Sequence, residues 1–212
     1  MTGQSVVLQA QGLGFGYPKQ PALFTDWAVQ IPPGVTWVGG GESSGKTTLL
    51  RLLAGELPAQ SGVLQVNGIV LADQAKAYRN EVFWVDPRSQ AFDSLTPLAY
   101  WDGLRRLHPA FANELLVDLI AGFALGPHLG KSLYMLSTGT KRKVFLAAAF
   151  ACGAALTLLD EPFAALDKAS IHLVLELLHE AATHPTRAWV VADYVAPHTV
   201  ALAGMIALGL LD

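Results

Sequence analysis

The residues with the clearest chemical potential form a glycine-rich stretch that runs into a lysine and two threonines. They are Gly40, Gly41, Glu42, Ser43, Ser44, Gly45, Lys46, Thr47 and Thr48. The stretch satisfies the pattern G-x-x-x-x-G-K-[ST], in which backbone N–H groups close around phosphates at the positive end of a helix. Lys46 would neutralise the β- and γ-phosphate oxygens, and the Thr47 hydroxyl would bind Mg²⁺. The stretch predicts a site for ATP with magnesium, and we expect the Glu42 carboxylate to point outward.

Two adjacent carboxylates follow later in the chain. Leu156–Leu159 is an apolar run that ends in Asp160 and Glu161. Asp160 would hold the magnesium ion, whereas Glu161 points in another direction and would polarise the attacking water as a general base. A strand that merely ends in solvated acids is the alternative, and the phosphate-binding pattern upstream favours the catalytic interpretation. Glu161 and Lys46 are therefore the expected catalytic residues, and Thr47 and Asp160 the expected metal ligands.

The elements that must position these groups are predicted by short apolar runs. Val35–Val38 is a buried strand that leads into the glycines, and Lys46–Leu53 is the helix that follows them. Further strands are predicted at Glu81–Val85, Ala155–Leu159, Ala188–Val191 and Met205–Leu208. Strands that alternate with helices form a mostly parallel sheet covered on both faces. The expected fold class is α/β.

Two regions depart from this alternation. Val6–Ile31 combines short β-like pieces with Gly and Pro turns, which is typical of antiparallel strands. Pro97–Phe123 changes to helical spacing and predicts an inserted helical lobe. We therefore expect one domain over residues 1–212. Its core would comprise residues 1–86 and 142–212, and its helical subdomain residues from about 87 to 141.

Composition argues against several classes of protein. Lys and Arg number 14 against 17 for Asp and Glu, and the net charge of −3 makes nucleic acid a poor partner. The single Cys152 rules out an internal disulfide framework. The longest apolar run, Val144–Leu159, is shorter than the roughly 18 residues that span a bilayer, and the first residues show no secretory signal. We expect a soluble cytoplasmic chain that reaches a membrane only through a partner.

A third motif lies between the glycine-rich stretch and the acid pair. It consists of Leu136, Ser137, Thr138, Gly139 and Thr140, followed by three basic residues. This motif resembles the LSGGQ signature of ATP-binding cassette (ABC) proteins, although both threonines depart from it. A plain helix N-cap at Ser137 is the alternative. Ala164–Asp167 looks like the D-loop of the same family, with Asp167 as its acid, and the resemblance covers the chain from Tyr17 to about Leu208.

The resemblance implies a P-loop NTPase fold of the RecA-like type, with an N-terminal antiparallel β subdomain and an inserted α-helical subdomain. It also implies that Tyr17 stacks on adenine. In the family the signature faces the ATP of a second subunit, so Ser137 and Gly139 would contact the γ-phosphate bound to the partner's Lys46. Two ATP molecules would thus lie in a head-to-tail dimer, formed with itself or a similar cassette, which closes with nucleotide and opens after hydrolysis.

A transmembrane permease subunit is the further partner that the resemblance implies, with this chain peripheral on the cytoplasmic face of the membrane. A coupling helix of that subunit would contact Asp86–Trp101. The short chain and its Ser-Thr-Gly signature look like compact export-type cassettes, among them ABC-2 and haem-exporter ATPases. Two other functions stay open: a nucleotide-sensing regulatory subunit with weak hydrolysis, and a soluble ABC ATPase outside transport.

The first departure from the family pattern is Asp193, which stands where a histidine would touch the γ-phosphate. A carboxylate about 4 Å from a phosphate oxygen costs on the order of 4 kcal/mol at an effective dielectric near 20. Asp193 must therefore turn away, pair with a cation or hold a proton. Because one positioned electrostatic group is missing, we expect slow hydrolysis.

The second departure is Asp86–Gln90, where the family's glutamine is missing from its usual place. A longer loop would displace Gln90, or Asp86 would meet the Mg²⁺ itself, since a carboxylate is a competent hard ligand. The alternative is that Thr47 and Asp160 bind the metal normally and that this loop only touches a partner. The sequence leaves both possibilities open.

Overall fold

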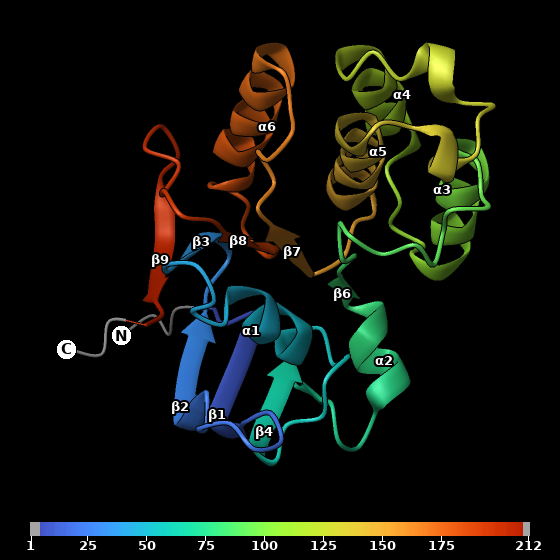
Figure 1. Ribbon diagram of the computed structural model, residues 1–212. Coiled ribbons are helices and arrows are strands. Elements are labelled where there is room, and N and C mark those ends of the chain that lie inside the picture. The colour runs from blue at the N-terminus through green and yellow to red at the C-terminus, as the bar shows by residue number, and fades with distance from the viewer. Residues whose placement is uncertain (1–4, 210–212) are drawn as a thin grey trace.

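Two sheets form the framework of the protein, one antiparallel and one parallel (Figure 1). The structure is a computed structural model that describes residues 5–209, so the expected limits of the domain, residues 1 and 212, lie outside this range. The antiparallel sheet has the strand order β2-β1-β4-β5. Its strands are β1 (Leu8–Phe15), β2 (Phe24–Ile31), β4 (Ser61–Val66) and β5 (Ile69–Val70). This sheet confirms the antiparallel arrangement that the Gly and Pro turns near the N-terminus predict.

The parallel sheet has the strand order β6-β7-β8-β3-β9. Its strands are β3 (Gly34–Gly39), β6 (Val82–Phe83), β7 (Leu156–Asp160), β8 (Ala188–Ala192) and β9 (Leu202–Ala207). In the pairing register, Val38 lies beside Ala192, and Ala192 lies beside Asp160. The carboxyl ends of parallel strands meet at one edge of a sheet, which is where α/β proteins bind ligands. The loops that begin at residues 40, 161 and 193 therefore leave from the same edge.

The α-helices cover the parallel sheet from both sides. They are α1 (Lys46–Leu53), α2 (Ala75–Asn80), α3 (Pro97–Leu107), α4 (Asn113–Gly122), α5 (Thr138–Ala151) and α6 (Lys168–Ala181). One buried cluster joins α1, through Leu49 and Leu53, to β8 at Val190. The other joins α6, through Val174, to β8 at Val191. Because successive side chains of a strand point to opposite faces, the two clusters lie on opposite sides of the sheet, as the alternation of strands and helices predicts.

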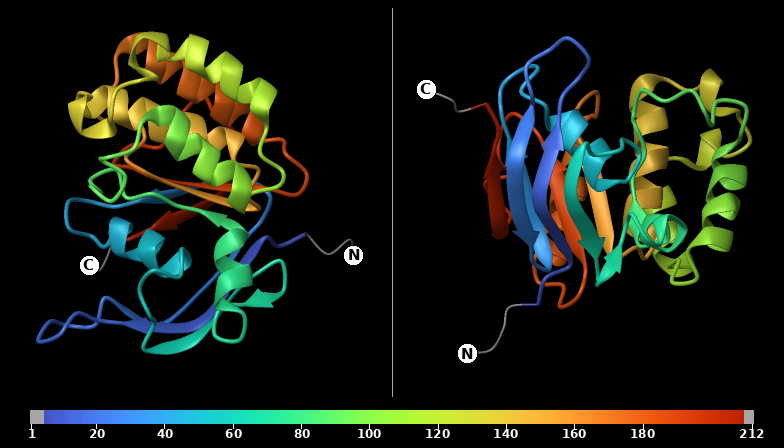
Figure 2. Two further views of the ribbon diagram at one scale, coloured as in Figure 1. Left: turned by 90° about the vertical axis from the view of Figure 1, so that its right-hand side faces the viewer. Right: turned by 90° about the horizontal axis from the view of Figure 1, so that it is seen from below.

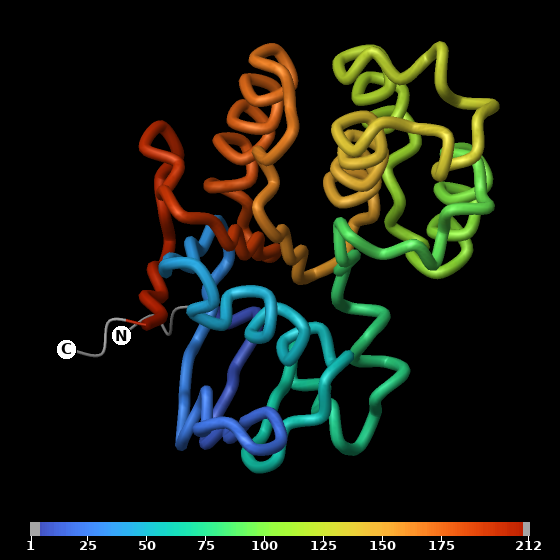
Figure 3. The backbone as a smooth tube through the Cα atoms, viewed as in Figure 1, coloured from blue at the N-terminus to red at the C-terminus, as the bar shows by residue number. Residues whose placement is uncertain are grey.

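Helices α3, α4 and α5 form a group to one side of the sheets, drawn in green to yellow in Figure 2. Figure 3 shows the chain entering this group after β6 and returning to the sheet through β7. Trp101 of α3 is fully buried, and its Nε1 donates a hydrogen bond of 3.2 Å to the carbonyl oxygen of Val144 in α5. Residue 141, near which the helical subdomain is expected to end, lies inside α5. The boundary of the subdomain remains a prediction.

The longest apolar run of the sequence divides between two elements. Its first part, from Val144 to Ala151, is the buried half of α5, and its last part is β7. None of the helices within residues 5–209 has both the length and the apolar character that crossing a bilayer requires.

Some elements differ from the sequence expectation at the edges of the fold. Helix α2 was not predicted, because only Tyr78 among its residues is buried and no apolar stripe marks it. The strand expected at residues 81–85 is reduced to Val82–Phe83, which pairs with β7 over those two residues only. Strand β9 begins at Leu202 rather than Met205, and its residues alternate between half-buried and exposed, a weaker signal than a continuous apolar run.

Tyr78 ties α2 to the C-terminal end of α1. Its buried hydroxyl donates a hydrogen bond of 2.6 Å to the carbonyl oxygen of Leu53, a carbonyl that the end of α1 leaves without a helical partner. We expect Tyr78→Phe to lower the free energy of unfolding by about 1–2 kcal/mol, measured by urea denaturation. Tyr134→Phe, at a side chain that is 69% exposed, is the matched control and should change nothing. Equal stability of the two variants would contradict a structural role for this bond.

Candidate nucleotide site

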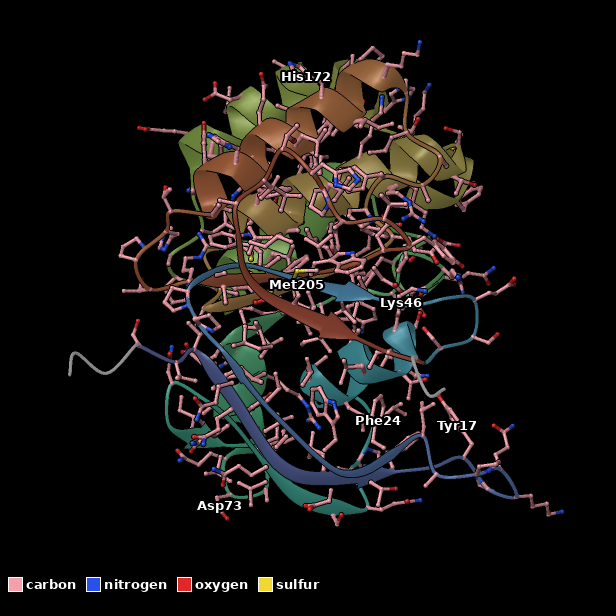
Figure 4. All side chains as sticks on the ribbon, turned by 90° about the vertical axis from the view of Figure 1, so that its left-hand side faces the viewer. Tyr17, Phe24, Lys46, Asp73, His172 and Met205 are labelled. Carbon is pink, nitrogen blue, oxygen red and sulfur yellow. The ribbon has the colours of Figure 1, made fainter. Side chains whose placement is uncertain are left out.

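A cleft of about 330 Å³ opens at the edge of the parallel sheet where β3 and β7 end. Its lining includes residues 42–48 of the glycine-rich loop together with Tyr17, Arg88, Glu161 and Tyr194. Figure 4 shows Lys46 and Tyr17 at the same end of the molecule, far from His172. The structure thus brings together the loop, Tyr17 and Glu161, as the sequence predicts. It adds Arg88 and Tyr194, to which the sequence analysis gave no role.

The glycine-rich loop is shaped for close approach of a ligand. Gly45, which precedes α1, has φ of +96°, and a Cβ atom there would come within 2.9 Å of the Leu23 side chain. Ser43 also adopts the left-handed conformation, at φ +58°. Because α1 begins at Lys46 without a capping side chain, the N–H groups of its first turn remain for a ligand. The buried hydroxyl of Ser44 likewise has no hydrogen-bond partner among residues 5–209.

Lys46 is buried in this loop, with 5% of the residue exposed. Its Nζ donates hydrogen bonds to the carbonyl oxygens of Gly40 and Gly41, at 2.7 and 2.8 Å, and the ring centroid of Tyr194 lies 4.0 Å from it. An ammonium group has three N–H donors, so one donor remains for an anion. Glu42 is exposed, as expected, although it also lines the cleft.

Tyr17 borders the cleft beside the first turn of α1. Its hydroxyl lies 3.1 Å from the Thr48 hydroxyl, and its ring packs edge-on against Phe15 with centroids 5.0 Å apart. The residue is 37% exposed. A fixed, partly exposed aromatic ring next to a phosphate loop suits stacking on a planar base.

Thr47 and Asp160 connect the loop to the end of β7. The Thr47 hydroxyl donates a hydrogen bond of 2.7 Å to Oδ2 of Asp160, whose Oδ1 is buried and has no partner in the described part of the chain. Burial raises the pKa of Asp160, and the Thr47 hydrogen bond opposes that shift. A hydroxyl beside an unpartnered carboxylate oxygen is the donor set that Mg²⁺ uses when phosphates supply its other ligands. These residues fit such an ion, although no cluster of three or more acidic, His or Cys ligands occurs within residues 5–209.

Backbone hydrogen bonds fix the residues that follow β7 and β8. Glu161 has a left-handed φ of +46°, and its N–H donates to the carbonyl oxygen of Ala192 at 2.8 Å. The Asp193 carboxylate turns back on its own loop and accepts a hydrogen bond of 2.7 Å from the Tyr194 N–H. Burial raises the pKa of Asp193, the Tyr194 N–H opposes the shift, and the Glu161 carboxylate adds to it. Asp193 is not part of the cleft lining.

Arg142 of α5 holds the backbone of the acid pair. Its Nη1 donates hydrogen bonds to the carbonyl oxygens of Asp160 and Glu161. Both acceptors are backbone atoms, so the two carboxylates keep their oxygens free of this guanidinium. No pattern in the sequence signals this contact, because α5 and β7 approach each other only in the folded chain.

The loop after β6 brings one of its residues to the cleft and leaves the others outside the lining. Gln90 is exposed and is not among the residues that line the cleft. Asp86 accepts a hydrogen bond of 2.8 Å from the Arg88 N–H through its Oδ1, so this oxygen shapes the loop. Arg88 is the residue of this loop that reaches the cleft.

The signature residues lie at the start of α5, away from this chain's own cleft. Ser137 caps the helix, since its hydroxyl accepts a hydrogen bond of 3.2 Å from the Thr140 N–H. A Cβ atom on Gly139 would come within 2.4 Å of the Ala165 carbonyl oxygen, so the signature packs against the segment of residues 164–167. Asp167 caps α6, and its hydrogen bond from Lys143 keeps the pKa of its carboxyl well below the usual range.

A glycine-rich loop between a parallel strand and a helix, with an acid at the end of a neighbouring strand, defines a P-loop nucleotide-binding protein. Residues 24–164 match the family described as ABC transporter. The chain therefore belongs to the ABC transporter ATP-binding family, as the order of its motifs predicts.

Curated relatives include ATP-binding proteins named for transport in both directions. The chain is 36% identical over 180 residues to the molybdenum import ATP-binding protein ModC of Saccharophagus degradans, a match that covers 82% of this chain and 49% of that protein. It is 36% identical over 144 residues to the cytochrome c biogenesis ATP-binding export protein CcmA of Wolbachia pipientis, covering 66% of this chain and 67% of that protein. The match thus spans about half the length of the ModC relative.

Solved structures confirm the fold class. An ATP-binding subunit of an ABC transporter superposes with a TM-score of 0.78 at 23% identity, over 88% of this chain and 79% of that chain. An ATP-binding cassette dimer in a post-hydrolysis state, bound to ADP and Pi, superposes with a TM-score of 0.74 at 18% identity, over 89% of this chain and 88% of that chain. At these identities the likeness shows the fold alone.

Asp160→Asn tests whether the buried Asp160 carboxylate binds a cation, at a cost in stability when the cation is absent. Because burial disfavours its charge, the variant should unfold at a temperature higher by about 2–4 °C in magnesium-free buffer, the shift that roughly 1 kcal/mol gives in a domain of this size. ATP with Mg²⁺ should then stabilise the wild type more than the variant in the same thermal scan. Asp118→Asn, at an exposed position of α4, is the control. A lower midpoint for Asp160→Asn would contradict this account.

Proposed function

We propose that this chain binds ATP with Mg²⁺ and hydrolyses it to power transport through a separate membrane subunit. The observation that carries the proposal is the hydrogen bond of 2.7 Å between Thr47 and Asp160, which joins the phosphate loop to the acid strand beside the buried Lys46. Family membership supports ATP as the nucleotide. The relatives named for import and export support transport as the work that is driven.

Each side chain of the cleft has a distinct task in this proposal. Lys46 and the N–H groups at the start of α1 neutralise the β- and γ-phosphate oxygens. Thr47 and Asp160 would hold Mg²⁺, which when bound screens the phosphate charge. Glu161 accepts a proton from the attacking water. Its backbone is left-handed and is held by Arg142, so its side chain leaves the chain in a different direction from that of Asp160. Tyr17 orients the base.

The signature residues act on a second nucleotide in this proposal. Ser137, Thr138, Gly139 and Thr140 start α5 outside the cleft that this chain lines itself. A head-to-tail dimer would place the N-terminus of α5 against the γ-phosphate bound by the other subunit, where the helix dipole favours an anion. Asp167 would sit between the two sites through its contacts with Lys143 and α6.

The membrane partner would meet the loop and helix of residues 86–101, next to the cleft. Attachment through that partner would hold the chain on the cytoplasmic face of the membrane. The relatives are named for both import and export, and ATP-driven transport is the work common to them.

Lys46→Ala tests nucleotide binding itself. The substitution removes the buried ammonium from the loop, and we expect ATP affinity to fall by a factor of about 10–150, the loss of roughly 1.5–3 kcal/mol that hydrogen bonds to charged groups contribute. Titration calorimetry with Mg-ATP measures the change. Lys131→Ala, at an exposed lysine outside the cleft, should bind as the wild type does. Unchanged affinity in Lys46→Ala would remove the basis of the proposed function.

Glu161→Gln separates an ATPase from a regulatory binder. The amide keeps the size of the side chain and cannot accept a proton from water, so we expect hydrolysis to fall by about 100-fold or more and an ATP-bound dimer to accumulate. Size-exclusion chromatography with Mg-ATP detects that dimer. Glu180→Gln, at an exposed position of α6, is the matched control. A variant that hydrolyses at the wild-type rate and stays monomeric would favour a nucleotide sensor with little hydrolysis.

A further inference from the structure

Arg88 is a cation in the cleft to which neither the sequence motifs nor the family resemblance assigned a role toward the nucleotide. It lines the cleft with Lys46, Thr47 and Glu161. Its guanidinium forms no ion pair with any carboxylate among residues 5–209, although Glu161 shares the same lining. A guanidinium that faces a cleft and stays unpaired there retains its full set of donors for an anionic ligand.

The loop that carries Arg88 is held by hydrogen bonds of its own backbone and by a contact from α5. The Arg88 N–H donates to Oδ1 of Asp86 at 2.8 Å, the Ser89 N–H donates to the Asp86 carbonyl oxygen at 2.9 Å, and Pro87 restricts φ between them. Lys141 of α5 anchors the far side of the loop. Its Nζ donates a hydrogen bond of 2.8 Å to the Ser89 carbonyl oxygen and forms an ion pair with Asp93. These contacts set the position of the Arg88 backbone at the edge of the cleft.

Arg88 lies at the phosphate end of the cleft rather than at the Tyr17 end. The loop of Arg88 follows β6, which pairs in parallel with β7, the strand that ends in Asp160. Tyr194 in turn stacks over Lys46, with 4.0 Å between its ring centroid and Nζ. Arg88 therefore lines the cleft on the side of the acid pair, together with Glu161 and Tyr194.

The charged side chains of the lining show why a second cation favours the binding of a triphosphate. Lys46 and Arg88 are the cationic side chains of the described lining, and Glu42 and Glu161 are the anionic ones. Without Arg88, one cation would face two carboxylates before a triphosphate arrives. Position 193, where the family has a histidine, supplies a carboxylate that turns away.

We propose that Arg88 is a catalytic residue that contacts the γ-phosphate in cis and provides the positive charge that position 193 lacks. This inference rests on the proposed ATPase function. The planar guanidinium matches two phosphate oxygens at once, which an ammonium cannot do, and charge at that position stabilises phosphoryl transfer.

In the step that Arg88 assists, the water oxygen forms a bond to the γ-phosphorus, and the bond from that phosphorus to the β-γ bridging oxygen breaks. The electron pair of the broken bond stays with ADP, the γ-phosphoryl group leaves as inorganic phosphate, and Glu161 takes the proton from water. Arg88 transfers no proton and acts through its charge and its hydrogen bonds to the phosphate oxygens.

Hydrolysis and binding by the full-length chain and its Arg88 variants test this assignment. Arg88→Ala should lower kcat by about 100-fold or more, weaken ATP binding and leave ADP affinity unchanged, because only ATP carries the γ-phosphate. Arg88→Lys should recover only part of the rate, since it restores charge without the fork. Arg106→Ala, an exposed arginine of α3, is the control and should behave as the wild type.

A rescue experiment separates charge supply from a structural role. Asp193→His in the Arg88→Ala background should raise kcat by at least about tenfold, because an imidazole N–H can donate to the γ-phosphate in place of the carboxylate, whereas a merely unfolded loop would not respond. Wild-type rates in Arg88→Ala, equal losses of ATP and ADP affinity, or no rescue by Asp193→His would each overturn the inference while leaving the proposed function intact. Absence of hydrolysis in the wild type, with nucleotide bound, would overturn both.

Discussion

Two buried charges of opposite sign lie in neighbouring segments of the cleft, and the structure gives each of them a neutral partner. Lys46 is held by the carbonyl oxygens of Gly40 and Gly41, and Asp160 by the Thr47 hydroxyl. Removing a charge from water is unfavourable unless its hydrogen bonds are replaced, and here the replacement is partial on both sides. A ligand that brings phosphate to the lysine and a cation to the acid completes both sets at once, and this gives the cleft its preference for a metal-bound nucleotide.

The rest of the fold serves to keep these two groups in place. Parallel pairing aligns the ends of β3, β7 and β8, so the phosphate loop and the acid pair start from one edge without any contact between their side chains being required. Helix α1 is buried between the two sheets, which fixes Lys46 from behind. Arg142 then fixes the backbone of Asp160 and Glu161 from the side of α5.

Local patterns in the sequence predict most of this arrangement. The helix Lys46–Leu53 has the predicted bounds because a glycine with positive φ starts it and an apolar run fills it. Family membership and fold class were also predicted, from the order of the motifs, and are confirmed. Helix α2 was not predicted, because it has one buried residue and no apolar stripe. The contacts of Arg142 and Tyr194 were not predicted either, because they join residues distant in sequence that become neighbours only on folding. The roles of the site residues remain predictions.

Lys141 connects two regions with separate tasks. It stands one turn into the helix that Ser137 begins, and its ammonium is joined to the loop at Ser89 and Asp93. Any tilt of α5 that displaces this ammonium must therefore move the loop with it or break a partly buried ion pair. A partner that displaced the exposed start of α5 would therefore also displace the loop beside the cleft, through the contacts of Lys141.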